Sequence, residues 1–526
     1  MTILPLDPAA NATPEALRAF LARCRAAAEA GGGPRLASIS IEVAPLDPLA
    51  VLESIFEPGE LHFYAERPAE GWAVAGAEAL LTLEAGGPDR FAAAQRFIDD
   101  VLARTIAVGE TGQLFGGPHF FGAFSFFDDV EPGEPFPPVR LFVPRWQVSR
   151  AQERTIAVAN LLVEPGADLD ALTAKVWRAH GKFRAFEYGE KSGTSLGGTG
   201  VPPVRSEVPQ HMGKMPMPQT SDHGRDARAT SEHGQDARAT SEHGQDARAT
   251  SDHGRDARAT EQEEYRAAVA RAVAMIAEGR FEKIVLARCK ELAAPGALHP
   301  LRLLNGLRQR FPDCYAFSVA NGRGQSFIGA SPERLLRVEA GRLLTEALAG
   351  SAARGSSASE DAALASALLS DEKELREHRH VVASIERRLA PLGLRLDHPA
   401  RPGLKRLANV QHLHTPVNAV LPAGVRLLDV LARLHPTPAV GGTPRTAACA
   451  HIRELEGFPR GLYAGPVGWI DHRGGGEFLV AIRSALIDGA SARAYAGGGI
   501  VAGSDPEREF AETELKFKAL LDALLA

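Results

Sequence analysis

Four copies of a ten-residue unit interrupt the chain at 221–260, and they limit what the rest of the sequence can fold into. The copies read SDHGRDARAT, SEHGQDARAT, SEHGQDARAT and SDHGRDARAT, and alanine supplies nearly all of their apolar character. Such a segment cannot bury enough apolar surface to offset the conformational entropy lost on ordering. With the Gly-, Ser-, Thr- and Pro-rich stretch before them, the repeats predict a disordered insertion at 191–260. The flanking parts, 1–190 and 261–526, need not then be separate domains.

The repeats also place a histidine at every tenth position, which raises the question of a metal site. These histidines are His223, His233, His243 and His253. Metal affinity depends on ligands that converge on one point, and this segment has no rigid frame to hold them. We therefore expect a spacer.

Composition excludes several classes of protein. The 526 residues are 44% apolar and 24% charged, which is typical of a soluble globular protein. The net charge of −6 argues against a nucleic-acid-binding protein, which needs a concentrated basic face. The N-terminus lacks a signal-peptide pattern, and no apolar run is long enough to span a membrane. We expect a cytoplasmic monomer with no nucleic-acid or membrane partner.

The four cysteines, Cys24, Cys289, Cys314 and Cys449, are scattered without C-x-x-C spacing. This usage fits a reducing compartment and argues against a zinc site.

Strand and helix patterns alternate irregularly in the part before the insertion. Alternation predicts a strand at Ala37–Val43, and apolar residues at helical spacing predict a helix at Arg90–Ile106. A dense aromatic strand is predicted at Phe120–Phe127. No catalytic constellation is evident here, so we interpret 1–190 as scaffold.

The part after the insertion has the same mixed character. The capping box Thr260–Glu263 predicts the start of a helix. Strands are predicted at Phe281–Arg288 and Phe478–Ile487, and a hairpin at Leu335–Thr345. Strands and helices in this order predict an α+β fold with mixed α/β layers.

The stretch Gly497–Lys516, GGGIVAGSDPEREFAETELK, has the strongest pattern of a binding site. Its three glycines would let the backbone approach a ligand closely in a loop, and the capping box that starts at Ser504 predicts a helix. Glu509 and Glu512 share one face of that helix, with Lys516 one turn beyond. The pattern predicts a site for a small anion held through a divalent cation, or else a solvated Glu/Lys face.

A second pair of glutamates three residues apart, Glu374 and Glu377, lies on the predicted helix Asp371–Leu389. Mg²⁺ prefers a few carboxylates together with substrate oxygens and water. Two facing helix edges would supply such a site. Each pair alone is equally compatible with a solvated helix face.

Two single residues are candidates for proton transfer. Lys283 lies within an apolar strand, where burial would lower its pKa and make it a general base. The alternative is a strand-edge lysine with its amine in water. Glu333 lies in a turn between strands and could donate a proton if its pKa is raised. The alternative is an acid paired with Arg334.

Arg483, Tyr463 and His435 are the remaining candidates for binding. An arginine inside the apolar strand Phe478–Ile487 requires an anionic partner, either a substrate carboxylate or a buried acid of the protein. Tyr463 lies in a Gly-rich segment. His435 begins a Pro- and Gly-rich turn that could line a pocket.

Nine stretches of the chain together resemble the chorismate-binding enzyme family, in the family's order and over most of 261–526. Two stretches of the first part, FYAERP and FFGAFSFFDD, resemble the family more weakly. The repeats are a departure from the family's pattern. The nine stretches are FEKIVLAR, FIGASPERLLR, TEALAGSAARG, DEKELREHRHVV, VQHLHTPV, HPTPAVGGTP, GFPRGLYAGPVGW, FLVAIRSALI and GGGIVAGSDPEREFAETELK.

The resemblance implies one large domain with antiparallel-rich sheets and helices on the outside. It also implies a reaction type, because the amidotransferring members typically have glutamine where this chain has Lys283. Lysine at this position resembles the members that add water, the isochorismate and salicylate synthases. Isochorismate synthase, which would feed menaquinone or siderophore synthesis, is the expected activity. The alternatives are salicylate synthase, an anthranilate or aminodeoxychorismate synthase, and a non-catalytic chorismate-binding scaffold.

The resemblance also implies a role for each candidate. Lys283 would take a proton from the water that attacks C2 of chorismate, and Glu333 would protonate the departing C4 hydroxyl. Mg²⁺ would be held by Glu377 and Glu509, supported by Glu374 and Glu512. The residues expected to bind the substrate are Tyr463, Arg483, Lys516, His435 and the backbone near Gly350, Ser351, Gly497 and Gly499.

Overall fold

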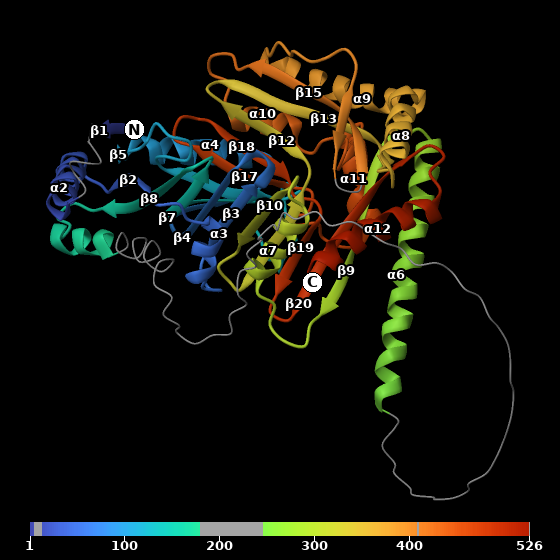
Figure 1. Cartoon of the computed structure of the whole chain (residues 1–526), viewed down its shortest axis with the longest axis horizontal. Helices are drawn as coiled ribbons and strands as arrows, with labels where there is room; N and C mark the ends of the chain where they lie inside the picture. Colours follow the sequence, from blue (N-terminus) through green and yellow to red (C-terminus); the bar gives the residue numbers. More distant parts are fainter. Residues whose placement is uncertain (5–12, 179–245, 408–409, 525–526) are drawn as a thin grey trace, which may run out of the picture. The chain divides into compact units, whose positions relative to one another are not determined.

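The computed structural model describes residues 1–4, 13–178, 246–407 and 410–524 (Figure 1). The chain divides into two units, one made of Met1–Gly189 and Glu261–Ala526 and the other of Glu190–Thr260. The two parts of the first unit share strand pairs, so they form one folded body. Most of the predicted insertion lies outside the described residues.

One arm of the sheet runs through both parts of the first unit. Its pairs are antiparallel except for the two made by β5. In order of hydrogen bonding it contains β1 (Thr2–Leu4), β5 (Thr105–Gly109), β2 (Arg35–Val43), β8 (Arg154–Val163), β7 (Val139–Ala151), β4 (Trp72–Ala85), β3 (His62–Arg67), β10 (Tyr315–Ala320), β11 (Gln325–Ser331), β19 (Ser484–Asp488), β20 (Ser491–Val501), β9 (Lys283–Ala293) and β16 (Gly442–Thr443).

A second arm branches from β7, because one end of that strand pairs with β6 and the other with β8. All of its pairs are antiparallel. From β7 outward it contains β6 (His119–Phe124), β17 (Pro466–Asp471), β18 (Gly476–Val480), β12 (Arg334–Glu339), β13 (Arg342–Ala353), β15 (Val410–Val420) and β14 (Gly403–Arg406).

Helices cover the outer faces of both arms. Helices α8 and α9 pack on β13, and α10 packs on β12, as the upper part of Figure 1 shows. Helix α11 packs on β9, and α12 on β20. The helices are α2 (Pro14–Gly31), α3 (Pro48–Ser54), α4 (Arg90–Ala103), α6 (Asp246–Ala277), α7 (Pro300–Arg310), α8 (Ala358–Ser370), α9 (Glu372–Leu389), α10 (Leu427–Leu434), α11 (Arg445–Glu456) and α12 (Pro506–Leu524), with short 3-10 turns η1 (Pro68–Glu70) and η2 (Ala390–Leu392).

Aromatic side chains from both arms fill the main core. Phe120, Phe121 and Phe124 of β6 are fully buried, as the predicted aromatic strand required. Phe121 stacks on Phe63 of β3, and Phe124 contacts Phe478 of β18. This packing joins the two parts of the chain in one core.

Much of the predicted secondary structure is confirmed. The predicted strand at Ala37–Val43 lies within β2, and the predicted hairpin is β12 and β13, whose residues Glu339 and Arg342 pair across the turn. The α+β class with antiparallel-rich sheets and outer helices is also confirmed. Among the described helices, none combines the length and apolar character needed to cross a bilayer.

Several predicted boundaries are wrong. Strand β6 ends at Phe124, short of the predicted Phe127, and β9 spans Lys283–Ala293 where Phe281–Arg288 was predicted. Helix α4 ends at Ala103 because Thr105 already pairs in β5. Helix α6 begins at Asp246 and runs through Thr260, so the capping box is not its start. At α12, Asp505 accepts the amide of Arg508, so the cap lies one residue beyond Ser504.

Two further corrections concern the candidate site. The predicted strand Phe478–Ile487 is two strands, β18 and β19, because Arg483 adopts φ +51° and breaks the extended backbone. The three glycines Gly497–Gly499 lie within β20 and pair with β9, whereas the pattern predicted a loop.

Candidate active site

The chain crosses from one arm of the sheet to the other at two adjacent places. The first crossing, between β11 and β12, carries Glu333, and the second, between β18 and β19, carries Arg483. The amide of Val480 donates to the Glu333 carbonyl at 3.1 Å, and the amide of Ala330 to the Arg483 carbonyl at 3.1 Å. These bonds join the two crossings, so the fold places both predicted site residues at one junction.

Lys283 begins β9 and is held on both sides. It pairs with Val501 of β20 and with Thr443 of β16, so it is not an edge residue. Gly499 leaves room for its side chain, because a Cβ there would lie 2.9 Å from Lys283 Cε. Burial lowers the pKa of Lys283, and the charges of Glu377, Lys516 and Glu333 also act on it. The alternative of an amine in open water is therefore not supported.

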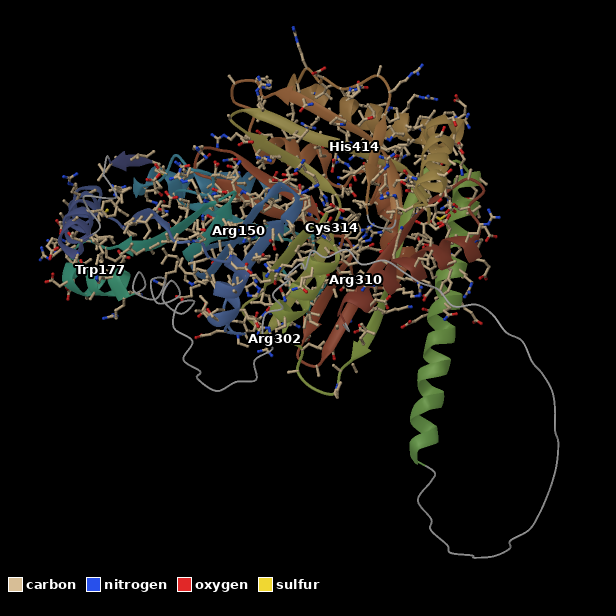
Figure 2. All side chains as sticks on the ribbon, viewed as in Figure 1. Arg150, Trp177, Arg302, Arg310, Cys314 and His414 are labelled. Atoms are coloured by element: carbon tan, nitrogen blue, oxygen red, sulfur yellow. The ribbon has the colours of Figure 1, made fainter. Side chains whose placement is uncertain are left out.

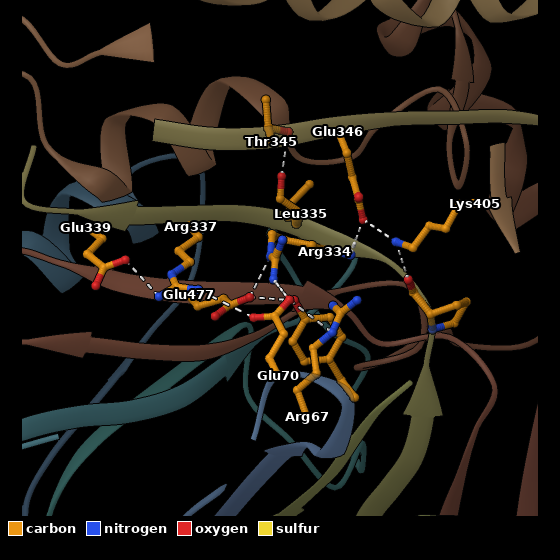
Figure 3. A network of polar contacts seen from close by, with 12 residues as sticks. Arg67, Glu70, Arg334, Leu335, Arg337, Glu339, Thr345, Glu346, Lys405 and Glu477 are labelled. Atoms are coloured by element: carbon orange, nitrogen blue, oxygen red, sulfur yellow. Dashed lines mark hydrogen bonds and ion pairs between the residues drawn. The ribbon is translucent and has the colours of Figure 1, made fainter. Parts of the chain in front are cut away.

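Glu333 has the ionisation expected of a proton donor near neutral pH. Burial, followed by the negative charge of Glu346, raises the pKa of Glu333 to about 7, against the opposing charges of Lys405 and Lys283. Its predicted alternative partner, Arg334, instead pairs with Glu477 at 2.6 Å and with Glu70 at 2.5 Å, as Figure 3 shows. The alternative of a turn acid paired with Arg334 is therefore wrong.

The four glutamates predicted to bind metal lie in two pairs, one on α9 and one on α12. Burial and the charge of Glu377 raise the pKa of Glu374. Burial also raises the pKa of Glu509, with Glu512 adding to the effect and a hydrogen bond from Ser504 opposing it. A carboxylate whose pKa is raised by a neighbouring carboxylate lies where a cation would be stabilised.

The structure does not bring these pairs together into one cluster. Among the described residues, no group of three or more His, Cys, Asp or Glu side chains lies close enough to hold a metal ion. The charges of Glu377 and Glu512 both act on Lys283, so both helices face the same lysine.

Cationic side chains gather at the same junction. Arg483 contacts Cys314 Sγ at 3.9 Å and forms no ion pair with a carboxylate of the described residues. Lys516 donates to the carbonyl of Gly497 at 2.8 Å and pairs with Glu512 at 2.7 Å. Burial, and then the charges of Arg483, Lys405 and Lys516, lower the pKa of His412 to about 4. Such a cationic junction is suited to an anionic ligand.

Some of the remaining predicted binding residues lie at this junction. The Tyr463 hydroxyl lies 3.0 Å from where a Cβ on Gly497 would stand, so glycine is needed there. Gly350 has φ +83°, and a Cβ on it would lie 3.0 Å from Glu374. The Ser351 hydroxyl bonds to His412 Nδ1 at 2.7 Å.

The structure does not bring His435 to this junction. The residue is 5% exposed, and its Nε2 lies 2.9 Å from the carbonyl of Phe126, a bond that fixes it in the core. Burial lowers the pKa of His435 to about 3. The segment that follows His435 contributes by supporting β9. Its residues Gly442 and Thr443 form β16, which pairs with the start of β9.

A buried ion pair supports β9 beyond the end of β16. Glu456 and Arg460 are each 1% exposed. Glu456 accepts the amide of Ala287 at 2.7 Å, and Arg460 donates to the carbonyl of Val285 at 2.8 Å. Along this edge of β9, the strand that carries Lys283, these two side chains therefore form hydrogen bonds that a neighbouring strand would otherwise form.

Sequence reasoning missed four residues at this junction: Glu346, Lys405, His412 and His414. The two histidines alternate on β15 and are both half-buried, so period two in VQHLHTPV could have indicated a shared face. Figure 2 shows His414 above Cys314, the residue that Arg483 contacts. Nothing in the local sequence distinguishes Lys405 from a surface lysine.

The chain belongs to the chorismate-binding enzyme family. The family's sequence model, described as "Chorismate binding enzyme", matches residues 19–196 and 216–525. A relative named salicylate biosynthesis isochorismate synthase, from Pseudomonas aeruginosa, is 36% identical over 516 residues, which are 97% of this chain and 94% of the relative.

Two further relatives are named for the same reaction. The isochorismate synthase MenF of Bacillus subtilis is 39% identical over 264 residues, 50% of this chain and 56% of its own length. The solved structure of MenF, the menaquinone-specific isochorismate synthase of Escherichia coli, matches with a TM-score of 0.67 and 26% identity, covering 94% of this chain and 95% of that one.

Proposed function

We propose that this protein is an isochorismate synthase, which adds water at C2 of chorismate and releases the C4 hydroxyl. One observation carries the proposal: a lysine with a lowered pKa and a glutamic acid with a pKa of about 7 act on each other at one junction. Their environments move the two pKa values toward each other, as a base and an acid working at one pH require. The similarity to the Pseudomonas aeruginosa enzyme over 97% of the chain supports the same reaction.

The two residues carry the two proton transfers of this reaction. The neutral amine of Lys283 takes a proton from water as the water oxygen bonds to C2. Both ring double bonds shift by one position, the C4–O bond breaks, and the neutral carboxyl of Glu333 donates its proton to the departing hydroxyl. The product is an isomer of the substrate, so the reaction needs no oxidant or second substrate.

The cationic side chains would bind the two carboxylates of chorismate. Arg483 can hold a carboxylate through two parallel N–H bonds, and it forms no ion pair within the described residues. Lys516 and the Tyr463 hydroxyl lie on either side of Gly497 and would bind there. Backbone amides near Gly350, Ser351 and Gly499 complete the proposed set.

The glutamate pairs would hold Mg²⁺, through Glu377 and Glu509 with Glu374 and Glu512 in support. The raised pKa values of Glu374 and Glu509 fit such a role, because a bound cation would relieve the repulsion within each pair. When bound, the ion would neutralise negative charge on a substrate carboxylate.

Product analysis tests the proposal. Purified protein incubated with chorismate and MgCl₂ is expected to form isochorismate, and chelation of the metal with EDTA is expected to abolish this. Fluorescent salicylate with release of pyruvate would instead indicate a salicylate synthase. An aminated product that depends on ammonium would indicate an amidotransferring enzyme, and no turnover at all would favour a non-catalytic binding protein.

A further inference from the structure

Polar side chains from β13 and β14, the two strands that flank β15, bind the peptide groups on both sides of Glu333. Glu346, on β13, accepts the amide of Arg334 at 3.1 Å. Lys405, on β14, donates to the carbonyl of Pro332 at 3.0 Å and to Glu346 at 2.7 Å. Figure 3 shows Lys405 directed at Glu346 above the end of β12. The turn is therefore held one residue before and one residue after the acid.

A third strand completes the binding of Glu346. His414, on β15, lies with Nε2 2.8 Å from the second carboxylate oxygen, and a carboxylate only accepts, so Nε2 carries the proton. Burial would raise the pKa of Glu346, but the hydrogen bonds from His414 and Lys405 outweigh it and lower the pKa to about 2. Glu346 is therefore a buried, fully ionised carboxylate at neutral pH.

The charges around Glu333 act in opposite directions. Glu346 on β13 favours the protonated carboxyl, whereas Lys405 on β14 and Lys283 on β9 favour the ionised form. Arg334, its neighbour in the chain, directs its guanidinium to Glu477 and Glu70. Removal of Glu346 or of Lys405 should therefore change the proton affinity of Glu333 with opposite signs.

We infer that Glu346, Lys405 and His414 are positioning residues that hold the turn of Glu333 in place and control the proton on its carboxyl group. This inference rests on the proposed function. None of the three is required to contact the substrate; they act through Glu333. Glu346 contributes in two ways, through its charge and through the hydrogen bond to the amide of Arg334.

The pH profile of kcat in single variants tests the charge. Glu333 donates only when protonated, so kcat should fall as the pH rises through its pKa. Glu346→Gln removes a negative charge, lowers that pKa and should move the falling limb about one pH unit or more toward acid. Lys405→Met removes a positive charge and should move the same limb toward alkaline pH. A purely structural role would destabilise both variants without opposite shifts.

Two substitutions at the same position test the hydrogen bond. The side-chain oxygen of Gln can still accept the amide of Arg334, whereas Ala cannot. Glu346→Ala should therefore show the acid shift of Glu346→Gln and, in addition, a maximal kcat at least about tenfold lower, since misplacing a catalytic group is costly. Glu339→Gln is the matched control, because this exposed residue of β12 pairs, among the described residues, with Arg337 and not with the turn of Glu333.

The outcomes are separable. A wild-type protein that forms no isochorismate overturns the proposed function, and this inference with it. With an active wild type, folded Glu346→Gln and Lys405→Met proteins whose falling limbs stay in place overturn the control of the proton. Equal maximal kcat in Glu346→Gln and Glu346→Ala overturns the positioning role. Thermal unfolding of each variant checks that it is folded.

Discussion

Burial, followed by the charges of three neighbours on three different strands, sets the ionisation of Glu333; these neighbours are Glu346, Lys405 and Lys283. None is close to Glu333 in sequence, so the turn motif that contains it could not indicate its pKa. The same holds for Lys283. Its apolar strand predicted that the side chain is buried, but could not indicate that carboxylates on two helices act on its pKa. At the scale of the residue, the identity of each group was predictable and its chemical state was not.

Substitutions of the two proton-transfer residues should separate chemistry from folding. Lys283→Ala and Glu333→Gln are each expected to lower kcat by about 10²-fold or more, because general acid–base catalysis contributes roughly that much. Both side chains are half-buried and have no ion-pair partner in the described residues, so circular dichroism spectra should be unchanged. Wild-type turnover in either folded variant would contradict the assignment.

At the scale of the element, the pairing of β9 with β20 is what aligns the site. Antiparallel register places Gly499 opposite Val285 and Val501 opposite Lys283. The glycines are needed because side chains from neighbouring elements occupy the space above them. A pattern of three glycines predicted close approach correctly, but it could not indicate that the approaching group is the protein's own lysine.

Gly499→Ala tests this alignment. The added Cβ would lie 2.9 Å from Lys283 Cε and 3.3 Å from Nζ, at the flexible end of the side chain. The lysine should therefore move while the fold persists, with kcat reduced about tenfold to 10²-fold and little change in melting temperature.

The control for this variant is Gly296→Ala, where an added Cβ meets no atom within 4 Å. It should leave both kcat and the melting temperature close to wild type. Equal kinetics in Gly499→Ala and Gly296→Ala would show that Lys283 does not depend on the space above β20.

At the scale of the whole molecule, two parts separated by a long insertion form one unit. Strand β3 pairs with β10, and β6 with β17, so the first part of the chain completes both arms of the sheet. Glu70 of the first part also binds Arg334, the residue after Glu333. The scaffold therefore contributes directly to the position of the acid.

Deletion of the repeats tests whether they take part in function. Removing Ser221–Thr260 shortens the chain within the second unit and leaves every residue of the first unit in place. We expect turnover of chorismate to stay within about twofold of the full chain. A large loss of activity, with the first unit still folded by calorimetry, would assign a role to the repeats.

Sequence alone predicted the α+β class and the family correctly, and it proposed Lys283, Glu333 and the two glutamate pairs as site residues, because these inferences depend on local patterns and on short motifs. Only the tertiary structure placed Arg483 at a break between two strands and His435 in the core, since both depend on pairings across the sheet. It also decided that Glu346, Lys405 and His414 meet around one turn. Contacts between strands far apart in the chain leave no periodic trace in the sequence, so they appear only when the strands pair in the folded protein.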